Sequence, residues 1–500
     1  MRRRLQFAAK IPRYLPLVSL LVIAAAGNAA IAQAQSPGTF TRTGDMTTAR
    51  AQHTATMLTT GKVLMTGGTQ SGGFSSLSSA EIYDPKSGTF TRTGNMATGR
   101  RMHRATRLAD GRVLVVGGYE AAGVALKSAE LYDPSRGTFT AAGNMVTARG
   151  GHSAILLASS KVLIVGGYDV NAYPNLAPAE IYDPSSETFT AAAEYVARGG
   201  CDFCAPSVLL TDGTVLFPGQ YPAQVYDPVT DSFTPAGMMK AEQSAATLLT
   251  TGKVLFAGGE SDFGRSAAAE LYDPDTHTFT VIASMAWRRG WHTLTLLPNG
   301  QALAAGGETE SCSANACTFA GTLATAELYD PSTATFMATA DMTAKREIHT
   351  ATLLDDGRVL LAGGDSYGGI GIYYGATASA ELYAPDVLVP APALAFVSGT
   401  SQGAIYHAGT SHLAAPDDPA GVGELVDLSS TGLDTGSAIP PQVSIGGRLA
   451  EIISFRQPSG VAGMNQIRVR VPGAIAPGDA VPVRLFYLDR PSNEVTIAIR

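Results

Sequence analysis

The chain has 500 residues, a formal net charge of −7, 15% charged residues and 45% hydrophobic residues. This composition, with 55 glycines, is typical of a compact, glycine-rich β protein and excludes a largely disordered one. The acidic balance argues against binding to a phosphate backbone, so we expect no nucleic-acid partner.

The first 34 residues are predicted to be a secretory signal peptide. Its basic residues are Arg2, Arg3, Arg4, Lys10 and Arg13. They precede an apolar stretch over residues 15–26, and small residues around Ala32 offer a cleavage site. The alternative is an uncleaved membrane anchor, but the apolar stretch is short for a span. We expect a secreted, periplasmic or cell-surface protein that does not span the membrane after cleavage.

A unit of about fifty residues then recurs seven times between residues 38 and 385. Each unit carries a Thr-Phe-Thr-like strand, a diglycine and an Ala-Glu-Leu/Ile-Tyr-Asp-Pro segment, although Pro218-Gly219 replaces the diglycine in the fourth unit. The tyrosines that count the units are Tyr83, Tyr132, Tyr182, Tyr226, Tyr272, Tyr329 and Tyr383. This period is the one expected of propeller blades.

Short, β-branched apolar runs bounded by turn residues indicate strands within each unit. Asp110-Gly111 and its equivalents predict type I′ hairpins between the first two strands. Asp84-Pro85 and its equivalents predict type I turns between the last two. These tight turns fall on one face of the ring, and the variable loops after each diglycine fall on the other, the upper face. We expect Thr39-Phe40-Thr41 to complete the seventh blade and close the ring.

A proline-rich linker over residues 386–396 is followed by a second predicted domain, residues 397–500. Five apolar segments in it read as strands: Gln442–Ile445, Glu451–Phe455, Gln466–Val471, Val483–Tyr487 and Glu494–Ile499. Such closely spaced strands predict a small immunoglobulin-like β-sandwich. The expected fold class is therefore all-β, a seven-bladed propeller followed by this sandwich.

The repeated diglycine, tyrosine and aromatic fourth strand resemble the kelch family, although Phe replaces the family's usual Trp. The propeller is also similar to that of galactose oxidase, whose last blade likewise leads into an immunoglobulin-like domain. The C-terminal segment resembles an uncharacterised module of bacterial exported proteins, which implies no activity.

The resemblance to galactose oxidase implies a copper site with two Tyr and two His ligands and a Tyr crosslinked to Cys. In that family a Tyr-His dipeptide precedes the Asp-Gly-Arg-Val hairpin. The matching position here holds Ile348-His349, and the sixth unit holds Trp291-His292. Tyr406-His407 supplies the dipeptide only outside the blades. We therefore expect no copper and no other metal or cofactor.

Two kinds of polar residue repeat from unit to unit. Five histidines follow an arginine by three residues: His53, His103, His152, His292 and His349. They form either a metal ring or, as we favour, a repeated structural hydrogen bond, because ligands must converge within about 2 Å of one ion. A glutamate also precedes each Leu/Ile-Tyr pair, except for Gln224 in the fourth unit. These glutamates are predicted to be scaffold residues that pair with a strand-two Lys or Arg or accept backbone N–H groups. We assign no catalytic residue.

Four cysteines in an exported chain favour two disulfides. They are Cys201, Cys204, Cys312 and Cys317, and pairing within each loop is favoured over a cross-ring pair. A zinc site and a redox CxxC remain alternatives. The glycine-rich segment 369–375 is interpreted as a flexible upper loop rather than a nucleotide site.

The upper face is the best candidate for function. Its aromatic, acidic and guanidinium groups suit a sugar ring or a peptide anchor. The predicted ligand-binding residues are Tyr119, Glu120, Tyr168, Asp169, Trp287, Arg288, Trp291, Glu308, Asp365, Tyr367 and Tyr373. We expect a non-enzymatic binding protein for a protein or glycan ligand. The alternatives are an oxidase of the galactose oxidase type, another glycan-active enzyme, or a purely structural repeat protein.

Overall fold

The computed structural model describes residues 38–500 apart from ten short gaps. The gaps are residues 71–74, 168–177, 194–205, 219–221, 240–244, 262–263, 313–316, 369–371, 435 and 459–462. The chain divides into a compact unit over Pro37–Arg500 and a separate one over Met1–Ser36. The predicted signal peptide lies outside the described residues and stays a prediction. In the described part every regular element is a β-strand. That part contains no apolar helix of the length needed to cross a membrane.

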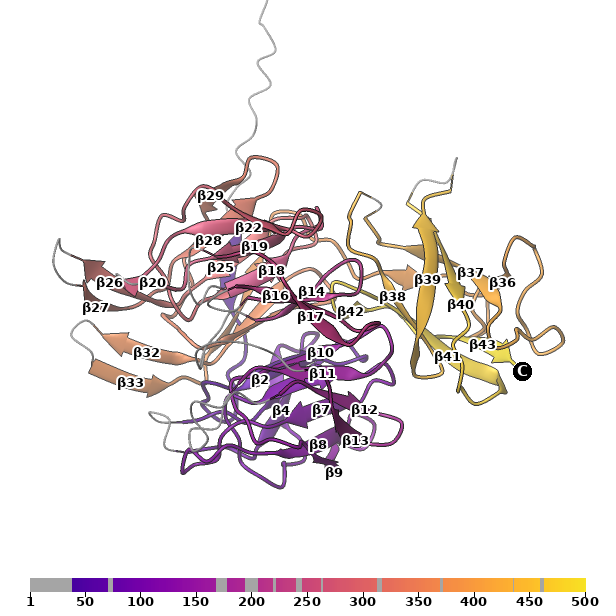
Figure 1. The fold of residues 1–500 in the computed structure, drawn as a ribbon, viewed down its shortest axis with the longest axis horizontal. Helices are drawn as coiled ribbons and strands as arrows, with labels where there is room; N and C mark the ends of the chain where they lie inside the picture. The colour runs from indigo at the N-terminus through magenta and orange to yellow at the C-terminus, as the bar shows by residue number, and fades with distance from the viewer. Residues whose placement is uncertain are drawn as a thin grey trace, which may run out of the picture. The chain divides into compact units, whose positions relative to one another are not determined.

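Seven four-stranded antiparallel sheets form the seven blades of a propeller (Figure 1). Blade 1 contains β2 (Thr54–Met57), β3 (Val63–Thr66), β4 (Ala80–Asp84) and β5 (Thr89–Arg92). Blade 2 contains β6 (Arg104–Arg107), β7 (Val113–Val116), β8 (Ser128–Asp133) and β9 (Thr138–Asn144). Blade 3 contains β10 (Ser153–Leu156), β11 (Val162–Val165), β12 (Glu180–Asp183) and β13 (Thr188–Ala191).

The remaining blades repeat this order. Blade 4 contains β14 (Val208–Leu209), β15 (Val215–Phe217), β16 (Gln224–Asp227) and β17 (Ser232–Pro235). Blade 5 contains β18 (Ala245–Leu248), β19 (Val254–Ala257), β22 (Ala269–Asp273) and β23 (Thr278–Val281). Blade 6 contains β24 (Thr293–Leu296), β25 (Ala302–Ala305), β28 (Ala326–Asp330) and β29 (Thr335–Ala338). Blade 7 contains β30 (Thr350–Leu353), β31 (Val359–Ala362), β34 (Ala380–Ala384) and β1 (Thr39–Arg42).

The N-terminal strand closes the ring, as the sequence predicts. β1 pairs antiparallel with β34, with Thr39 opposite Ala384 and Phe40 opposite Tyr383. The first strand of the propeller therefore supplies the outer edge of its last blade. This pairing covers the edge of β34 that would otherwise be left without a neighbouring strand.

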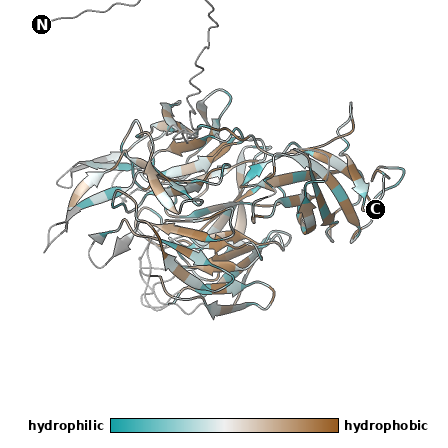
Figure 2. Ribbon diagram, turned by 90° about the horizontal axis from the view of Figure 1, so that it is seen from above, coloured by the Kyte–Doolittle hydropathy of each residue, from teal (hydrophilic) through white to brown (hydrophobic). Residues whose placement is uncertain are grey.

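The second strand of every blade is fully buried, and the hydrophobic residues of Figure 2 lie mainly on the strands. Each repeated tyrosine packs against the aromatic residue of the neighbouring outer strand, as Tyr83 does against Phe90 with 4.7 Å between ring centroids. The other pairs are Tyr132–Phe139, Tyr182–Phe189, Tyr226–Phe233, Tyr272–Phe279, Tyr329–Phe336 and Tyr383–Phe40. Phenylalanine thus supplies the aromatic contact of the fourth strand.

The hairpins between the first and second strands are not type I′ turns. In the Asp110-Gly111 turn only the glycine has a positive φ, 89°, and the Gly111 N–H bonds to the Leu108 carbonyl at 3.0 Å. This pattern is a type I turn followed by a left-handed glycine. Asp110 stays right-handed because its carboxylate accepts the N–H of Arg112 at 3.0 Å. The prediction was correct for the position of the hairpin and wrong for its type.

The diglycines allow neighbouring blades to touch. A Cβ on Gly363 would lie 2.3 Å from the carbonyl oxygen of Arg50 and 2.8 Å from Cε1 of His53, both in the next unit. Gly364 has a φ of 97°, and its N–H bonds to the same Arg50 carbonyl at 2.9 Å. No other residue provides both the left-handed backbone and the missing Cβ.

The upper loops of blades 5 to 7 form two-stranded hairpins that the sequence did not predict. They pair β20 (Glu260–Ser261) with β21 (Gly264–Arg265), β26 (Glu308–Cys312) with β27 (Cys317–Thr322), and β32 (Asp365–Gly368) with β33 (Ile372–Ala376). Two of them, β26–β27 and β32–β33, extend from the blades at the left of Figure 1. Of the segment 369–375, interpreted as a flexible loop, residues 372–375 lie in strand β33 and residues 369–371 lie outside the described residues.

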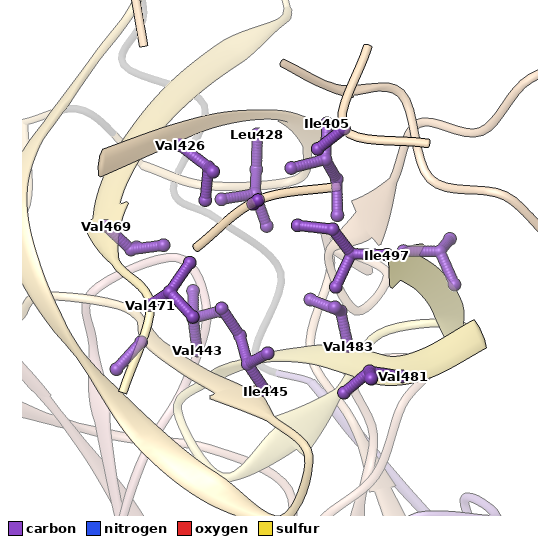
Figure 3. Packing of buried hydrophobic residues seen from close by; sticks show 14 of the residues in the cluster. Ile405, Val426, Leu428, Val443, Ile445, Val469, Val471, Val481, Val483 and Ile497 are labelled. Atoms are coloured by element: carbon purple, nitrogen blue, oxygen red, sulfur yellow. The ribbon is translucent and has the colours of Figure 1, made fainter. Parts of the chain in front are cut away.

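The C-terminal region forms a nine-stranded sheet around its own core. Its strands are β35 (Ala393–Leu394), β36 (Ile405–His407), β37 (Leu425–Thr431), β38 (Gln442–Ile445), β39 (Arg448–Arg456), β40 (Asn465–Arg470), β41 (Gly478–Tyr487), β42 (Arg490–Pro491) and β43 (Val495–Ile499). All five predicted strand segments are present. The core side chains point toward one another in Figure 3. The immunoglobulin-like arrangement and the exact domain boundaries stay predictions.

Candidate functional site

The repeated arginines and glutamates form buried ion pairs within the blades. Arg50 and Glu81 are both fully buried, with 2.6 Å between Nη2 and Oε1. The equivalent pairs are Arg100–Glu130, Arg149–Glu180, Arg289–Glu327 and Arg346–Glu381. Glu81 also accepts the backbone N–H of Thr48 at 3.1 Å. The scaffold role is as predicted, but the partner is the arginine of the blade-to-blade turn. The strand-two Lys62 pairs instead with Asp84, at 2.9 Å.

Three of the repeated histidines, His53, His103 and His349, make structural hydrogen bonds between blades. Nε2 of His103 lies 3.1 Å from Oγ1 of Thr54, and Nε2 of His53 lies 3.1 Å from Oγ1 of Thr350. Burial, followed by the nearby arginine charges, lowers the pKa of both rings well below the usual value. The rings are therefore neutral at physiological pH. Among the described residues, no group of three or more His, Cys, Asp or Glu side chains is placed to hold a metal ion.

The residue before each of these histidines has a left-handed backbone. The φ values are 55° for Gln52, 53° for Met102, 69° for Gly151, 56° for Trp291 and 49° for Ile348. Four of the five are not glycine, and a β-branched residue such as Ile348 rarely adopts this conformation. Strained backbone of this kind persists only where the surrounding structure enforces it, and it gathers at functional sites.

Backbone hydrogen bonds from blade to blade enforce the strain. The N–H of Ile348 bonds to the Trp291 carbonyl at 3.0 Å, and that of Gln52 bonds to the Ile348 carbonyl at 3.3 Å. Met102 donates to Gln52, and Gly151 donates to Met102, both at 3.0 Å. These bonds run through blades 6, 7, 1, 2 and 3. We call this set of five residues the mouth ring.

The mouth ring lies at one end of the central channel. The mouth ring lines a cavity of about 510 Å³, here called the mouth cavity, together with four of the repeated histidines and the first residues of inner strands. The four histidines are His53, His103, His292 and His349. A second cavity of about 600 Å³ shares inner-strand residues such as Ala55 and Ala105 with the first. It is also lined by Leu449, Phe486 and Leu488 of the C-terminal region. The volume of the mouth cavity is in the range of small-molecule sites.

Several hydrogen bonds join the C-terminal region to the tight turns of the lower face. The Ser444 hydroxyl donates to the Ala109 carbonyl at 2.7 Å, and Arg484 donates to the Thr59 carbonyl at 2.9 Å. The Leu449 N–H donates to the hydroxyl of Ser160 at 2.8 Å. The C-terminal region therefore lines the lower end of the channel, whereas the mouth ring lies at the upper end.

A buried carboxyl cluster lies beside the mouth ring. Glu347 precedes Ile348 and is 3% exposed, and its backbone bonds in both directions to Asp365 at 2.9 and 3.0 Å. Burial, followed by the charges of Glu308 and Asp365, raises the pKa of Glu347 to about 9. Arg265 of β21 makes an ion pair with Glu308. Glu347 therefore keeps its proton at neutral pH.

The structure brings only some of the predicted ligand-binding residues together. Trp291 lines the mouth cavity, and Glu308 and Asp365 join the carboxyl cluster. Tyr119 is buried under Arg101, whose guanidinium lies 5.4 Å from the ring centroid. Tyr367 packs edge-on against Phe319, with centroids 5.6 Å apart.

The other predicted residues lie elsewhere or outside the described part. Glu120 is partly exposed, Arg288 is exposed, and Trp287 is 49% exposed. None of these three lines the mouth cavity. Tyr168 and Asp169 lie outside the described residues, and Tyr373 is described only as part of β33. The ligand-binding role of all the predicted residues stays a prediction.

Sequence reasoning missed Gln52, Met102, Ile348, Arg104 and Glu347. Aligning the seven units on their repeated histidines would have revealed these residues. Gln52, Met102 and Ile348 each stand one position before a repeated histidine, Arg104 stands one after, and Glu347 stands two before. A residue that differs from its equivalents in the other units is recognised only when the units are compared position by position.

The structure describes two of the four cysteines. Cys201 and Cys204 lie outside the described residues. The register of β26 and β27 places Cys312 directly opposite Cys317. Cross-strand neighbours have Cα atoms at a separation that a disulfide can span. The disulfides themselves stay predictions.

Comparison with known proteins supports the fold. A family model described as "Kelch motif" matches residues 100–146. None of the curated proteins compared with the chain matches it. A solved structure described as "Novel fungal alcohol oxidase with catalytic diversity among the AA5 family, in complex with copper" has a TM-score of 0.57 and 18% sequence identity. The match covers 93% of this chain and 99% of the oxidase chain. At this identity the likeness shows the fold alone.

The residues present do not fit the copper site that the galactose oxidase likeness implies. Ile348, which has no oxygen, stands at the position of the expected Tyr. His349 is buried, and its Nε2 lies 3.2 Å from Oγ1 of Thr293. His407 of the Tyr406-His407 dipeptide bonds to Glu424 through Nδ1 and lies 3.0 Å from the Asp418 carbonyl through Nε2. We therefore derive no copper chemistry.

Proposed function

We propose that this protein is an exported, non-enzymatic binding protein whose propeller presents the channel mouth to a protein or glycan ligand. The observation that supports it most is the mouth ring. Strained backbone at Gln52, Met102, Trp291 and Ile348 holds four side chains around one cavity. A scaffold alone does not require this arrangement, since Gly151 makes the same turn in blade 3 without strain.

The mouth residues combine an amphipathic ring, apolar surface and a polar amide. Trp291 contributes an aromatic ring to the cavity lining, and Met102 and Ile348 add apolar contact. Aromatic and apolar surface with a few placed polar groups is typical of sites for small ligands and of interface anchors. Export follows from the predicted signal peptide and belongs to the same proposal.

A glycan array and a set of candidate exported proteins test this function. We expect the mature chain to bind a ligand and Trp291→Ala to weaken that binding at least tenfold, because a buried aromatic anchor carries a large share of the binding energy. Trp287→Ala is the matched control, since Trp287 is 49% exposed and does not line the mouth cavity. Full binding by Trp291→Ala, or equal losses in both variants, would contradict the proposed site.

A glycan-active hydrolase or lyase is a second candidate, favoured by the carboxyl cluster. A carboxyl group that is protonated at neutral pH can act as a general acid, and the pKa of Glu347 is raised to about 9. Release of reducing ends or of unsaturated products from a polysaccharide panel would support this candidate if Glu347→Gln abolished it and Glu120→Gln did not. Absence of product across the panel favours the binding protein.

A further inference from the structure

Arg104 interrupts a hydrogen-bond pattern that three other blades keep. It is the first residue of β6, and the equivalent positions are Thr54 in blade 1, Thr293 in blade 6 and Thr350 in blade 7. Each of these threonines bonds through Oγ1 to Nε2 of the histidine in the following blade. With arginine at this position, the next histidine, His152, keeps both ring nitrogens buried and without a hydrogen-bond partner.

Arg104 does not compensate by pairing with an acid. Its Nε donates to the His152 carbonyl at 2.6 Å. Among the residues that the structure describes, this is the guanidinium's one hydrogen bond, and no carboxylate lies within ion-pair distance of it. By contrast, Arg100 of the same blade pairs with Glu130 at 2.8 Å. The terminal N–H groups of Arg104 are therefore available to a ligand.

The surroundings of Arg104 leave its charge uncompensated. Arg104 is partly buried, and it is the one charged side chain among the described residues that line the mouth cavity. The histidine rings beside it are neutral, because burial and nearby arginines hold their pKa values low. A partly desolvated guanidinium without a counter-charge is unfavourable, and a bound anion removes that penalty.

We propose that the mouth cavity binds a carboxylate-bearing sugar, with its carboxylate on the guanidinium of Arg104. This inference rests on the proposed function and names its ligand class. The planar guanidinium matches a carboxylate through two parallel N–H groups. Trp291, which lines the same cavity from blade 6, offers a flat face to a sugar ring. A cavity of about 510 Å³ holds a ligand of this size.

Calorimetric titration of the mature chain with D-glucuronate and D-glucose tests the proposal, because the two sugars differ only in the carboxylate. We expect glucuronate to bind at least about tenfold more tightly, as charge-assisted hydrogen bonds allow. Arg104→Thr should abolish this preference, and Arg104→Lys should keep part of it. Arg136→Thr is the matched control, because the Arg136 side chain is 80% exposed on an outer turn of the same blade.

Thermal denaturation of Arg104→Thr will test whether the variant is folded. It also tests, independently of ligand binding, whether His152 lacks a hydrogen-bond partner because of Arg104. The new hydroxyl restores the threonine found in blades 1, 6 and 7, so His152 gains a partner. We expect the melting temperature to rise by about 2 °C rather than fall. A fall of several degrees would show that Arg104 has a structural role and would overturn the proposal.

Four results distinguish this inference from the proposed function. Equal binding of glucose and glucuronate, or an unchanged preference in Arg104→Thr, overturns the inference. Binding of L-glutamate but not of glucuronate also overturns it, because the ligand is then an acidic peptide or amino acid. A neutral ligand whose binding depends on Trp291 leaves the proposed function standing and removes only the acidic sugar.

Discussion

At the scale of single residues, the seven copies act as internal controls for one another. The strand register aligns each position of one blade with its equivalents. An exception such as Arg104, where blades 1, 6 and 7 have threonine, can therefore be recognised without any other sequence. Glu347 is an exception of the same kind, because the equivalent positions hold Ala51, Arg101 and Gly290. Each exception has a consequence that can be measured.

The stability of the protein should depend on pH through Glu347. Its pKa of about 9 in the folded state lies above the ordinary glutamate value of 4.5, so the folded state binds the extra proton. The contribution of Glu347 to the free energy of unfolding therefore falls as the pH rises from about 4.5 to 9. In Glu347→Gln an amide N–H takes the place of the carboxyl O–H and cannot ionise. The variant should therefore have a melting temperature a few degrees higher than the wild type at pH 8.5 but not at pH 5. A pH-independent effect would contradict the raised pKa.

The diglycines should tolerate no side chain. We expect Gly363→Ala to destabilise the protein by about 2–4 kcal/mol, because the left-handed backbone is strained and the Cβ meets the Arg50 carbonyl. Gly213→Ala is the matched control, since Gly213 also has a positive φ but a Cβ there has open space around it. It should lose only about 1–2 kcal/mol. Chemical denaturation measures both, and equal losses would show that the contact between blades carries no energy.

At the scale of elements, a buried arginine–glutamate pair fastens each of blades 1, 2, 3, 6 and 7 to the turn that precedes it. Arg50→Met should destabilise the protein by about 3–5 kcal/mol, because it leaves the buried carboxylate of Glu81 without a counter-charge. The double variant Arg50→Met/Glu81→Gln should recover part of this loss, since no unpaired charge remains. A double variant as unstable as the single one would place the energy in the hydrogen bonds of Arg50 to the Gly67 and Ser79 carbonyls.

The elements were largely predictable from the sequence, whereas the site was not. Turn residues and tyrosines repeat, so the strands and their order follow from the spacing. The mouth ring was hidden because Gln52, Met102, Trp291 and Ile348 all adopt a conformation that their residue types disfavour. Only Gly151 signals the turn. The hairpins β26–β27 and β32–β33 were missed because their sequences lack regular alternation of apolar and polar residues.

At the scale of the whole molecule, ring closure depends on one short strand. Deleting residues 38–42 should remove the outer strand of blade 7 and expose Tyr383, which packs against Phe40 with centroids 4.8 Å apart. We expect a melting temperature lower by roughly 10 °C or more and a tendency to aggregate through the freed edge of β34. A chain that begins at residue 37 is the control. An unaffected deletion variant would show that the remaining strands suffice to hold blade 7.

The pairing of β1 with β34 also sets the order in which the molecule can fold. Thr39 meets Ala384 only after the six intervening blades are available, so this contact joins segments that are distant in sequence. Contacts of high sequence separation form slowly. Blades 1 to 6 can assemble locally from the N-terminal side, and blade 7 stays incomplete until the last repeat has emerged. The rate-limiting step of folding should therefore be the docking of a four-residue strand whose own blade is made last.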